Sequence, residues 1–249
     1  MNIPIRKKWG QNFLIDPNII TKIISVLNPE KNEHILEIGP GKGALTKKMA
    51  SMNLNINAIE IDPMLCDYLK EKKFDNVKIY NEDILKFDCS IMDDNYMVIG
   101  NLPYNISTPI LFKFMENMNW KKMVVMLQKE VAERIVSKHG NKKYGRISIM
   151  MQSFFDVTLK FNIPKTVFNP QPKITSSLLL ITPKKNINIE YNNLKLVVEN
   201  AFKHRRKKLS HNLKNLIKEE MYNQIKDKRA EQLTVVDYQK LSHYIINNV

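Results

Sequence analysis

The segment Asn101-Leu102-Pro103-Tyr104 combines residue types that can hold and align an aromatic amine. The nitrogen of such an amine is a poor nucleophile because its lone pair is delocalised into the ring. Acceptors aimed at both N–H groups would free that lone pair, and the Asn101 side chain and the Leu102 main chain each offer a carbonyl. Tyr104 offers a ring face for a flipped base, worth about 1–3 kcal/mol. The pattern favours transfer of a group to a base amine over a structural Asn-Pro turn.

A second set of residues has the spacing of a nucleoside pocket. The loop "GPGKG" (39–43) places Gly39 and Gly41 between a predicted strand and a predicted helix, where a backbone passes close to a ligand. Glu60 ends the next strand, where a carboxylate can accept hydrogen bonds from ribose hydroxyls, and Asp83 ends the third. Two acids at successive strand ends favour a nucleoside site over simple caps of the following segments. These residues leave NAD, FAD and S-adenosylmethionine open.

The elements that must position these residues alternate along the chain. Buried strands are predicted at 34–38, 56–62, 77–83, 96–101 and 122–128. Helices are predicted at 16–27, 44–52, 63–73, 108–117 and 129–138. This alternation predicts an α/β fold with a parallel, doubly wound, Rossmann-like sheet. Its strands would bring Glu60, Asp83 and Asn101 to one carboxyl edge.

The rhythm changes in the last part of the chain. Segments 156–164 and 175–183 are predicted to form an antiparallel pair of strands at the sheet edge. Beyond Pro183 the sequence becomes polar, and 194–249 is predicted as helices rich in Lys and Arg. We therefore expect a catalytic domain at 1–183 and a small helical domain at 184–249.

The chain is strongly basic, with 39 Lys and Arg against 25 acidic residues and a formal net charge of +14. A composition rich in Lys, Asn and Ile explains scattered lysines but not clustered arginines. The densest cluster lies in a predicted helix at 203–209 and contains Arg205, Arg206, Lys207 and Lys208. We expect a nucleic-acid partner whose phosphates these side chains contact, rather than a merely solvated helix face. Arg6, Lys7 and Lys8 are expected to extend that surface.

Cysteine usage and the N-terminus point to a cytoplasmic protein. Cys66 and Cys89 form no CxxC pair, so neither a disulfide framework nor a zinc site is expected. The basic N-terminus is followed by no apolar run of the kind that a signal peptide has. Apolar runs are short and broken by charge, which argues against a membrane span.

Several motifs taken together resemble one known family. They are "GQNFL" (10–14), "EIGPGKGALT" (37–46), "NLPYNIS" (101–107), "QKEVAERI" (128–135), "YGRIS" (144–148), "FNPQPKITSSL" (168–178) and "AFKHRRKKLSHNL" (201–213). The combination resembles the small-subunit rRNA adenine N6,N6-dimethyltransferases over nearly the whole chain. The resemblance implies a Rossmann-like domain that uses S-adenosylmethionine, followed by a small helical domain. It implies a monomer that modifies two adjacent adenosines in a hairpin loop near the 3′ end of small-subunit rRNA during ribosome biogenesis.

The resemblance also implies roles for individual residues in cofactor binding. Asn12 and Leu14 would close the N-terminal edge of the cofactor pocket, and the loop with Gly39 and Gly41 would lie against the methionine part. Asn101 would border the transferred methyl group.

Further roles concern the nucleoside and the target base. Glu60 would bind the ribose, Asp83 the cofactor adenine, and Ile84 would pack on the adenine ring. Phe168 is similar to an aromatic residue that sandwiches the target base against Tyr104.

Three alternatives remain. A large-subunit rRNA adenine methyltransferase of the antibiotic-resistance type would share the loop and carry Ile where this chain has Leu102. A ribosome-assembly factor would bind RNA with methylation secondary, although the motif residues needed for catalysis are all present. An NAD-linked dehydrogenase would need an acid/base residue near the pocket, and none of the five His lies at a strand end there.

Overall fold

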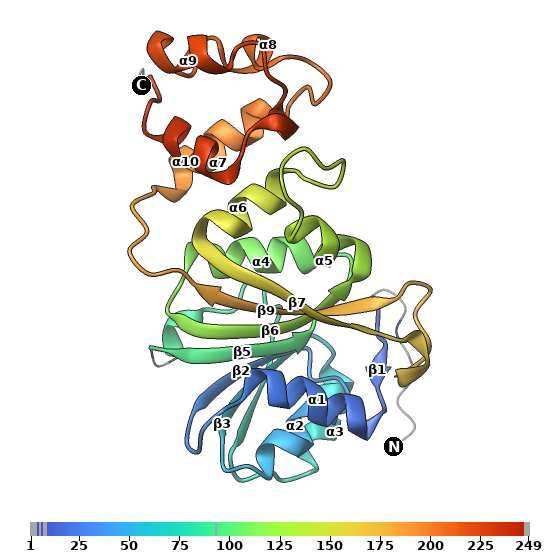
Figure 1. The fold of residues 1–249 in the computed structure, drawn as a ribbon. Helices are drawn as coiled ribbons and strands as arrows, with labels where there is room; N and C mark the ends of the chain where they lie inside the picture. Colours follow the sequence, from blue (N-terminus) through green and yellow to red (C-terminus); the bar gives the residue numbers. More distant parts are fainter. Residues whose placement is uncertain (1–3, 5, 7–8, 93, 247–249) are drawn as a thin grey trace. The chain divides into compact units, whose positions relative to one another are not determined.

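The computed structural model describes residues 4, 6, 9–92 and 94–246 (Figure 1). Lys7 and Lys8, which were expected to extend the basic surface, lie outside the described residues. The chain divides into two compact units. The first contains residues 1–132 and 158–183, and the second contains 133–157 and 184–249. One boundary lies between Pro183 and Lys184, where the change in composition predicted it. Residues 133–157, however, group with the C-terminal helices rather than with the first unit. The assignment of catalysis and RNA binding to separate domains stays a prediction.

A mixed sheet forms the centre of the first unit. Among the described residues its order is β4 (Val77–Asn81), β3 (Asn55–Glu60), β2 (His34–Ile38), β5 (Tyr96–Asn101), β6 (Trp120–Gln128), β9 (Ser176–Pro183) and β7 (Phe155–Ile163). The first five strands pair in parallel, and β9 runs antiparallel to β6. The predicted doubly wound α/β sheet is confirmed, with the two late strands at one edge and β7 outermost.

The strand order reverses between β2 and β5. The chain proceeds outward from β2 through β3 to β4 on one side and from β5 to β6 on the other. In such sheets the crevice for a ligand opens outside the carboxyl ends at this switch point. Glu60 and Asn101 are the last residues of β3 and β5, so both side chains arrive at that crevice.

Helices cover both faces of this sheet (Figure 1). They are α1 (Pro17–Leu27), α2 (Ala44–Ala50), α3 (Pro63–Lys70), α4 (Ser107–Glu116) and α5 (Lys129–Ile135), which spans the boundary of the two units. Helix α1 begins where Asp16 accepts hydrogen bonds from the backbone N–H groups of Asn18 and Ile19, as an N-cap does. Short 3-10 helices lie at Cys89–Ile91, Lys165–Val167 and Ala230–Gln232.

The central strands of the sheet are mainly apolar and buried. Ile35, Leu36, Val98, Ile99 and Val124 are completely buried. Such continuous apolar runs are typical of parallel strands covered on both faces, and their burial is the main stabilising contribution to the unit.

A short second sheet ties the N-terminal segment to the rest of the first unit. Strand β1 (Phe13–Leu14) pairs antiparallel with β8 (Phe168–Asn169), so that Leu14 lies opposite Phe168. This pairing was not predicted, because two-residue strands have no periodicity to read. It brings the "GQNFL" segment over the carboxyl edge of the sheet.

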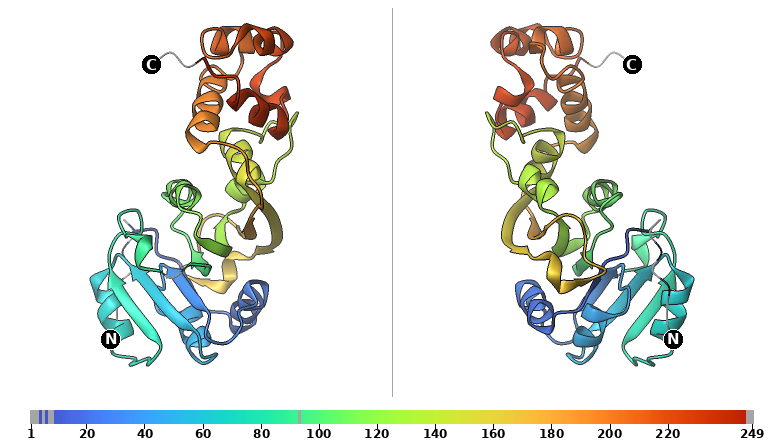
Figure 2. Two further views of the ribbon diagram at one scale, coloured as in Figure 1. Left: turned by 90° about the vertical axis from the view of Figure 1, so that its left-hand side faces the viewer. Right: turned by 90° about the vertical axis from the view of Figure 1, so that its right-hand side faces the viewer.

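The second unit is a cluster of helices, drawn in yellow-green to red in Figure 2. They are α6 (Arg146–Phe154), α7 (Tyr191–Ala201), α8 (Leu209–Leu213), α9 (Glu219–Ile225) and α10 (Val235–Ser242). Helix α10 packs on α6 and α7, and α7 packs on α8. The basic segment was predicted as part of a helix, but 202–207 is a series of turns between α7 and α8. Like charges three and four residues apart disfavour a helix there.

Candidate active site

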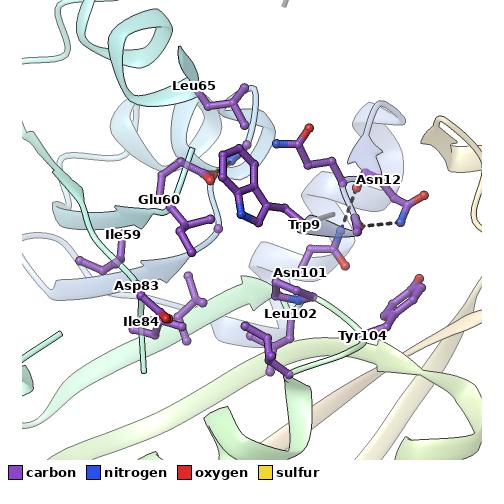
Figure 3. A pocket seen from close by; sticks show the side chains of 18 of the residues that line it. Trp9, Asn12, Ile59, Glu60, Leu65, Asp83, Ile84, Asn101, Leu102 and Tyr104 are labelled. Atoms are coloured by element: carbon purple, nitrogen blue, oxygen red, sulfur yellow. Dashed lines mark hydrogen bonds between the residues drawn. The ribbon is translucent and has the colours of Figure 1, made fainter. Parts of the chain in front are cut away.

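A pocket opens at the carboxyl ends of β2, β3 and β5 and beside the loop after β4 (Figure 3). Most of the residues predicted from the sequence to form the site line it together: Asn12, Gly39, Gly41, Glu60, Asp83, Ile84, Asn101, Leu102 and Tyr104. In Figure 3, Asp83 and Ile84 lie at one end, and Tyr104 lies at the other. Segments far apart in the sequence therefore converge on one cavity, as the sheet topology requires.

Other lining residues were missed by sequence reasoning. They are mainly apolar or belong to the N-terminal segment: Trp9, Gln11, Phe13, Ile59 and Leu65. Trp9 projects into the pocket between Glu60 and Asn101 in Figure 3. The position of Trp9 directly before "GQNFL" was the one sequence signal that it could line the site. Its residue type gave no signal, because tryptophan is equally common in a protein core.

Leu14 lies in an adjoining pocket rather than in the main one. This second cavity shares Asn12, Gly39 and Asn101 with the main pocket and reaches Glu37 behind the glycine loop. Glu37 is 1% exposed and accepts a hydrogen bond of 2.7 Å from the Thr46 hydroxyl. Burial raises the pKa of the Glu37 carboxyl to about 7.

The glycine loop needs glycine for two physical reasons. Gly39 and Gly41 have φ values of +63° and +58°, in the left-handed region that side chains disfavour. A Cβ at Gly41 would also lie 2.9 Å from the ring of Phe13. The backbone and the N-terminal strand can therefore approach each other closely only with glycine at this position.

Glu60 lies 6% exposed at the end of β3 and supports the loop it faces. Its two carboxylate oxygens accept hydrogen bonds of 3.0 Å from the backbone N–H groups of Gly41 and Asp62. Burial raises the pKa of the Glu60 carboxyl. Each oxygen keeps a second lone pair, so these bonds leave capacity for a ligand hydroxyl.

Asp83 lies two residues beyond the end of β4, and its side chain caps the turn that follows. Its Oδ1 accepts a hydrogen bond of 2.9 Å from the backbone N–H of Leu85, which fixes the carboxylate beside Ile84. Ile84 is 6% exposed and adds an apolar wall to the same end of the pocket. A carboxylate beside an apolar side chain suits a flat heterocycle that carries an amino group.

Asn101 presents an unpaired acceptor. Its Nδ2 donates a hydrogen bond of 2.9 Å to the main-chain oxygen of Asn12 (Figure 3). Because a carbonyl can only accept, this bond determines which way the amide points. Oδ1 is buried and has no hydrogen-bond partner among the described residues. A buried unpaired carbonyl oxygen in a pocket is a point where a ligand donor is expected.

The loop after Asn101 is tethered on both sides. The backbone N–H of Leu102 donates to the main-chain oxygen of Met126 at 3.2 Å. The phenol oxygen of Tyr104 lies 2.7 Å from Oγ of Ser176. Burial raises the pKa of the Tyr104 phenol, which keeps it protonated at neutral pH. The ring is held in place at the mouth of the pocket.

The position of Phe168 does not agree with the expected stacking role. Its side chain is 1% exposed and belongs to the apolar core with Leu14 and Val167, away from the pocket lining. In β8 the side chains alternate, so Phe168 points into the core and Asn169 points outward. As the structure stands, Phe168 has no exposed face on which a base could stack.

The basic cluster of the second unit separates into two kinds of residue. Arg205 donates to the main-chain oxygens of Lys142 and Tyr144 and pairs with Glu231 at 3.5 Å. Lys208 pairs with Asp227 at 2.9 Å, and both of these side chains are exposed. Arg205 therefore holds the loop before α6, a structural role that the sequence did not reveal.

Arg206 and Lys207 are exposed in the turn between Arg205 and Lys208.

Among the residues that the structure describes, no helix is long and apolar enough to cross a membrane. Within the same residues no group of three or more His, Cys, Asp and Glu side chains could hold a metal ion.

Comparison with known proteins points to one group. The profile of the family described as Ribosomal RNA adenine dimethylase matches residues 2–247. A protein of Francisella tularensis subsp. novicida (strain U112), named Ribosomal RNA small subunit methyltransferase A, is 42% identical over 96% of this chain and 97% of its own length. A protein of the same name from Francisella tularensis subsp. tularensis (strain SCHU S4 / Schu 4) is 41% identical over the same shares.

Solved structures show the same fold. A dimethyladenosine transferase from Plasmodium falciparum superposes with a TM-score of 0.82 at 24% identity, over 94% of this chain and 99% of that one. The 23S rRNA methyltransferase ErmE superposes with a TM-score of 0.72 at 21% identity, over 93% and 98%. At these identities the likeness is one of fold alone.

Proposed function

Because this chain belongs to the ribosomal RNA adenine dimethylase family, we propose that it dimethylates N6 of two adjacent adenosines in a hairpin loop near the 3′ end of small-subunit rRNA. The relatives at 42% identity carry the name of a small-subunit enzyme, which supports this subunit as the substrate. The observation that carries the chemistry is the buried Oδ1 of Asn101, which lines the pocket and has no hydrogen-bond partner among the described residues.

The pocket residues fit S-adenosylmethionine as the cofactor. Glu60 would accept hydrogen bonds from the ribose, and Asp83 would accept one from the adenine amino group; both line the pocket. Ile84, also in the lining, would pack on the adenine ring. When bound, the cofactor supplies an electrophilic methyl group.

Residues on the other side of the pocket would hold the methionine part of the cofactor. The glycine loop, with Gly39 and Gly41, lines that side. Asn12 and Leu14 would close the N-terminal edge, and Asn101 would border the methyl group. All five of these residues line the adjoining cavity, whereas Tyr104 does not.

Asn101, at the end of β5, and the loop that follows it hold the target base. The Oδ1 of Asn101 accepts one N–H of the adenine amine, and the main-chain oxygen of Leu102 accepts the other. Two acceptors favour a nitrogen whose lone pair is free to attack. The ring of Tyr104 stacks on the base and holds it in line with the methyl group. No strong base is required, because the nitrogen carries a positive charge once it has taken the methyl group, and this cation is acidic and loses a proton to water readily.

The partner is proposed to be an immature small ribosomal subunit, bound by a monomer in the cytoplasm. A net charge of +14 supports association with a polyanion, and Arg206 and Lys207 supply exposed cations. Arg205 and Lys208 contribute to the local field while pairing within the protein.

The test is transfer of labelled methyl groups from S-adenosylmethionine to small subunits that lack this modification. Large subunits and a protein without rRNA serve as parallel acceptors, and nucleoside analysis identifies the product. We expect dimethyladenosine in small-subunit rRNA alone. Label in the large subunit would move the protein to the resistance-type enzymes. RNA binding without transfer to any acceptor would favour an assembly factor and overturn the proposed activity.

A further inference from the structure

The ring of Tyr104 is held at its far end by a residue distant in the sequence. The phenol oxygen lies 2.7 Å from Oγ of Ser176, and either atom can donate. Ser176 is the first residue of β9 and lies opposite Gln128, the last residue of β6. It is completely buried. A strand of the sheet therefore reaches directly into the base-binding end of the site.

The backbone around Tyr104 is fixed independently of that bond. The N–H of Leu102 is bonded to Met126, and the hydroxyl of Ser107 donates to the main-chain oxygen of Tyr104 at 3.4 Å. With the main chain held on both sides, the remaining freedom of the ring is rotation about its side-chain bonds. A hydrogen bond at the phenol removes most of that freedom.

We infer that Ser176 is a positioning residue for methyl transfer, whose hydroxyl holds the face of Tyr104 at the angle at which the target base stacks. The inference rests on the proposed function, since it concerns the base of that reaction. Ser176 itself touches neither base nor cofactor and acts through the tyrosine ring alone. A ring that is held before the base arrives loses less conformational entropy on binding it.

The buried hydroxyl of Ser176 is stabilised only if it has a hydrogen-bond partner. Burying a hydroxyl costs free energy unless it is hydrogen-bonded, and an alanine would fill the same place without that cost. The bond to Tyr104 supplies the partner for Ser176. The pair thus connects the interior of the sheet with an aromatic ring at the pocket mouth.

The neighbouring serine offers a matched control. Ser177 is also completely buried, and its hydroxyl donates a hydrogen bond of 2.7 Å to Oδ1 of Asn162. Successive residues of a strand face opposite sides of the sheet, so this second bond leads away from the pocket. Ser176 and Ser177 therefore match in residue type, burial and bond length and differ in what they hold.

The experiment compares Ser176→Ala with Ser177→Ala in the full chain, using single-turnover methyl transfer to small subunits. We expect Ser176→Ala to slow transfer about three- to tenfold, the size of one hydrogen bond, and Ser177→Ala to slow it less than about twofold. The affinity for S-adenosylmethionine should stay unchanged in both variants. Urea unfolding shows whether the two variants lose similar stability, so that a difference in rate reflects position.

A double-mutant cycle separates positioning from general loosening. Tyr104→Phe keeps the ring and removes the phenol oxygen, so we expect the same slowing as in Ser176→Ala. In the Tyr104→Phe background, Ser176→Ala should then cause no further slowing. Equal slowing in the two serine variants, or a full further loss in the double variant, would overturn the positioning role. Wild-type protein that transfers no methyl groups would instead overturn the proposed function, and this role with it.

Discussion

The side-chain nitrogen of Asn101 donates to the main-chain oxygen of Asn12 over 2.9 Å, and the two residues are 89 positions apart. This bond turns Oδ1 of Asn101 into the pocket, where it has no partner among the described residues. The N-terminal segment thus sets the direction of the acceptor to which we assign the adenine amine. Its pairing with β8 holds Phe13 and Leu14 beside that acceptor.

The first prediction concerns this acceptor. Asn101→Ala should lower the rate of methyl transfer by about 100-fold or more, because a preorganised partner of the reacting group is lost. Binding of S-adenosylmethionine, measured by calorimetry, should remain within a few-fold of wild type. Asn105→Ala is the control, because Asn105 is exposed in the same loop and should transfer normally. Retained turnover in Asn101→Ala would falsify the role of Asn101.

The second prediction concerns the glycine loop. Gly41→Ala should weaken cofactor binding at least tenfold, and it should lower the free energy of unfolding by about 1–3 kcal/mol because of its positive φ. The new Cβ would also press on Phe13. Gly145→Ala is the control, since Gly145 has extended backbone and open space around its Cβ position. Calorimetry and urea unfolding measure both effects, and normal cofactor affinity in Gly41→Ala would contradict a close approach of the ligand to this loop.

The third prediction concerns RNA binding by the second unit. Replacing both Arg206 and Lys207 by Ala should weaken binding and reduce the slope of log K against log salt by about 1.5, because fewer counterions are released. Lys47 and Lys48, exposed on α2, provide a control pair with the same loss of charge. Filter binding at several salt concentrations measures the slopes. Equal slopes for the two double variants would remove Arg206 and Lys207 from the RNA surface.

Arg205→Ala tests the other half of the basic cluster. Its ion pair with Glu231 and its bonds to main-chain oxygens indicate a loss of stability in the second unit rather than a selective loss of RNA contact. Thermal unfolding of this variant accompanies the binding series. A stable variant with a reduced salt slope would instead return Arg205 to the RNA surface.

The fourth prediction concerns pH and Glu37. Burial raises the pKa of this carboxyl from 4.5 to about 7 in the folded protein. Stability contributed by its protonated form is therefore fully present below pH 4.5 and is lost as the pH rises through 7. The span corresponds to roughly 3 kcal/mol of unfolding free energy.

Glu37→Gln should flatten the pH dependence of that free energy between pH 5 and 8. Urea unfolding across this range compares it with wild type and with Glu199→Gln, a change at an exposed position of α7. A pH profile of Glu37→Gln that matches wild type would show that Glu37 is ionised in the folded state throughout.

Much of the fold could be predicted from the sequence because its signals are local. The strands at 34–38 and 96–101 have the bounds expected for them. The first apolar run ends at the glycine loop that starts at Gly39, and the second ends just before Leu102-Pro103. Helix α1 follows from Asp16, Pro17 and one apolar face. Parallel topology then brings the ends of β3 and β5 together, which placed Glu60 and Asn101 correctly at one pocket.

Other features were outside the reach of local signals. Most of the helix expected at 203–209 is absent: 202–207 are turns, because like charges three and four residues apart disfavour a helix, and only Leu209 is helical, as the start of α8. Phe168 is an aromatic residue of the kind on which a base can stack, but its ring is buried among core residues and has no exposed face.

By itself, the sequence determined which residue types stand at the strand ends. From these it predicted the α/β fold and an amine held beside a nucleoside pocket. The tertiary structure alone decided the direction of the Asn101 amide, the anchoring of Tyr104 by Ser176 and the internal pairing of Arg205. Each of these depends on a hydrogen bond or ion pair between residues distant in the chain. Such contacts form only when packing brings both partners within about 3 Å, and no local pattern of residue types encodes that distance.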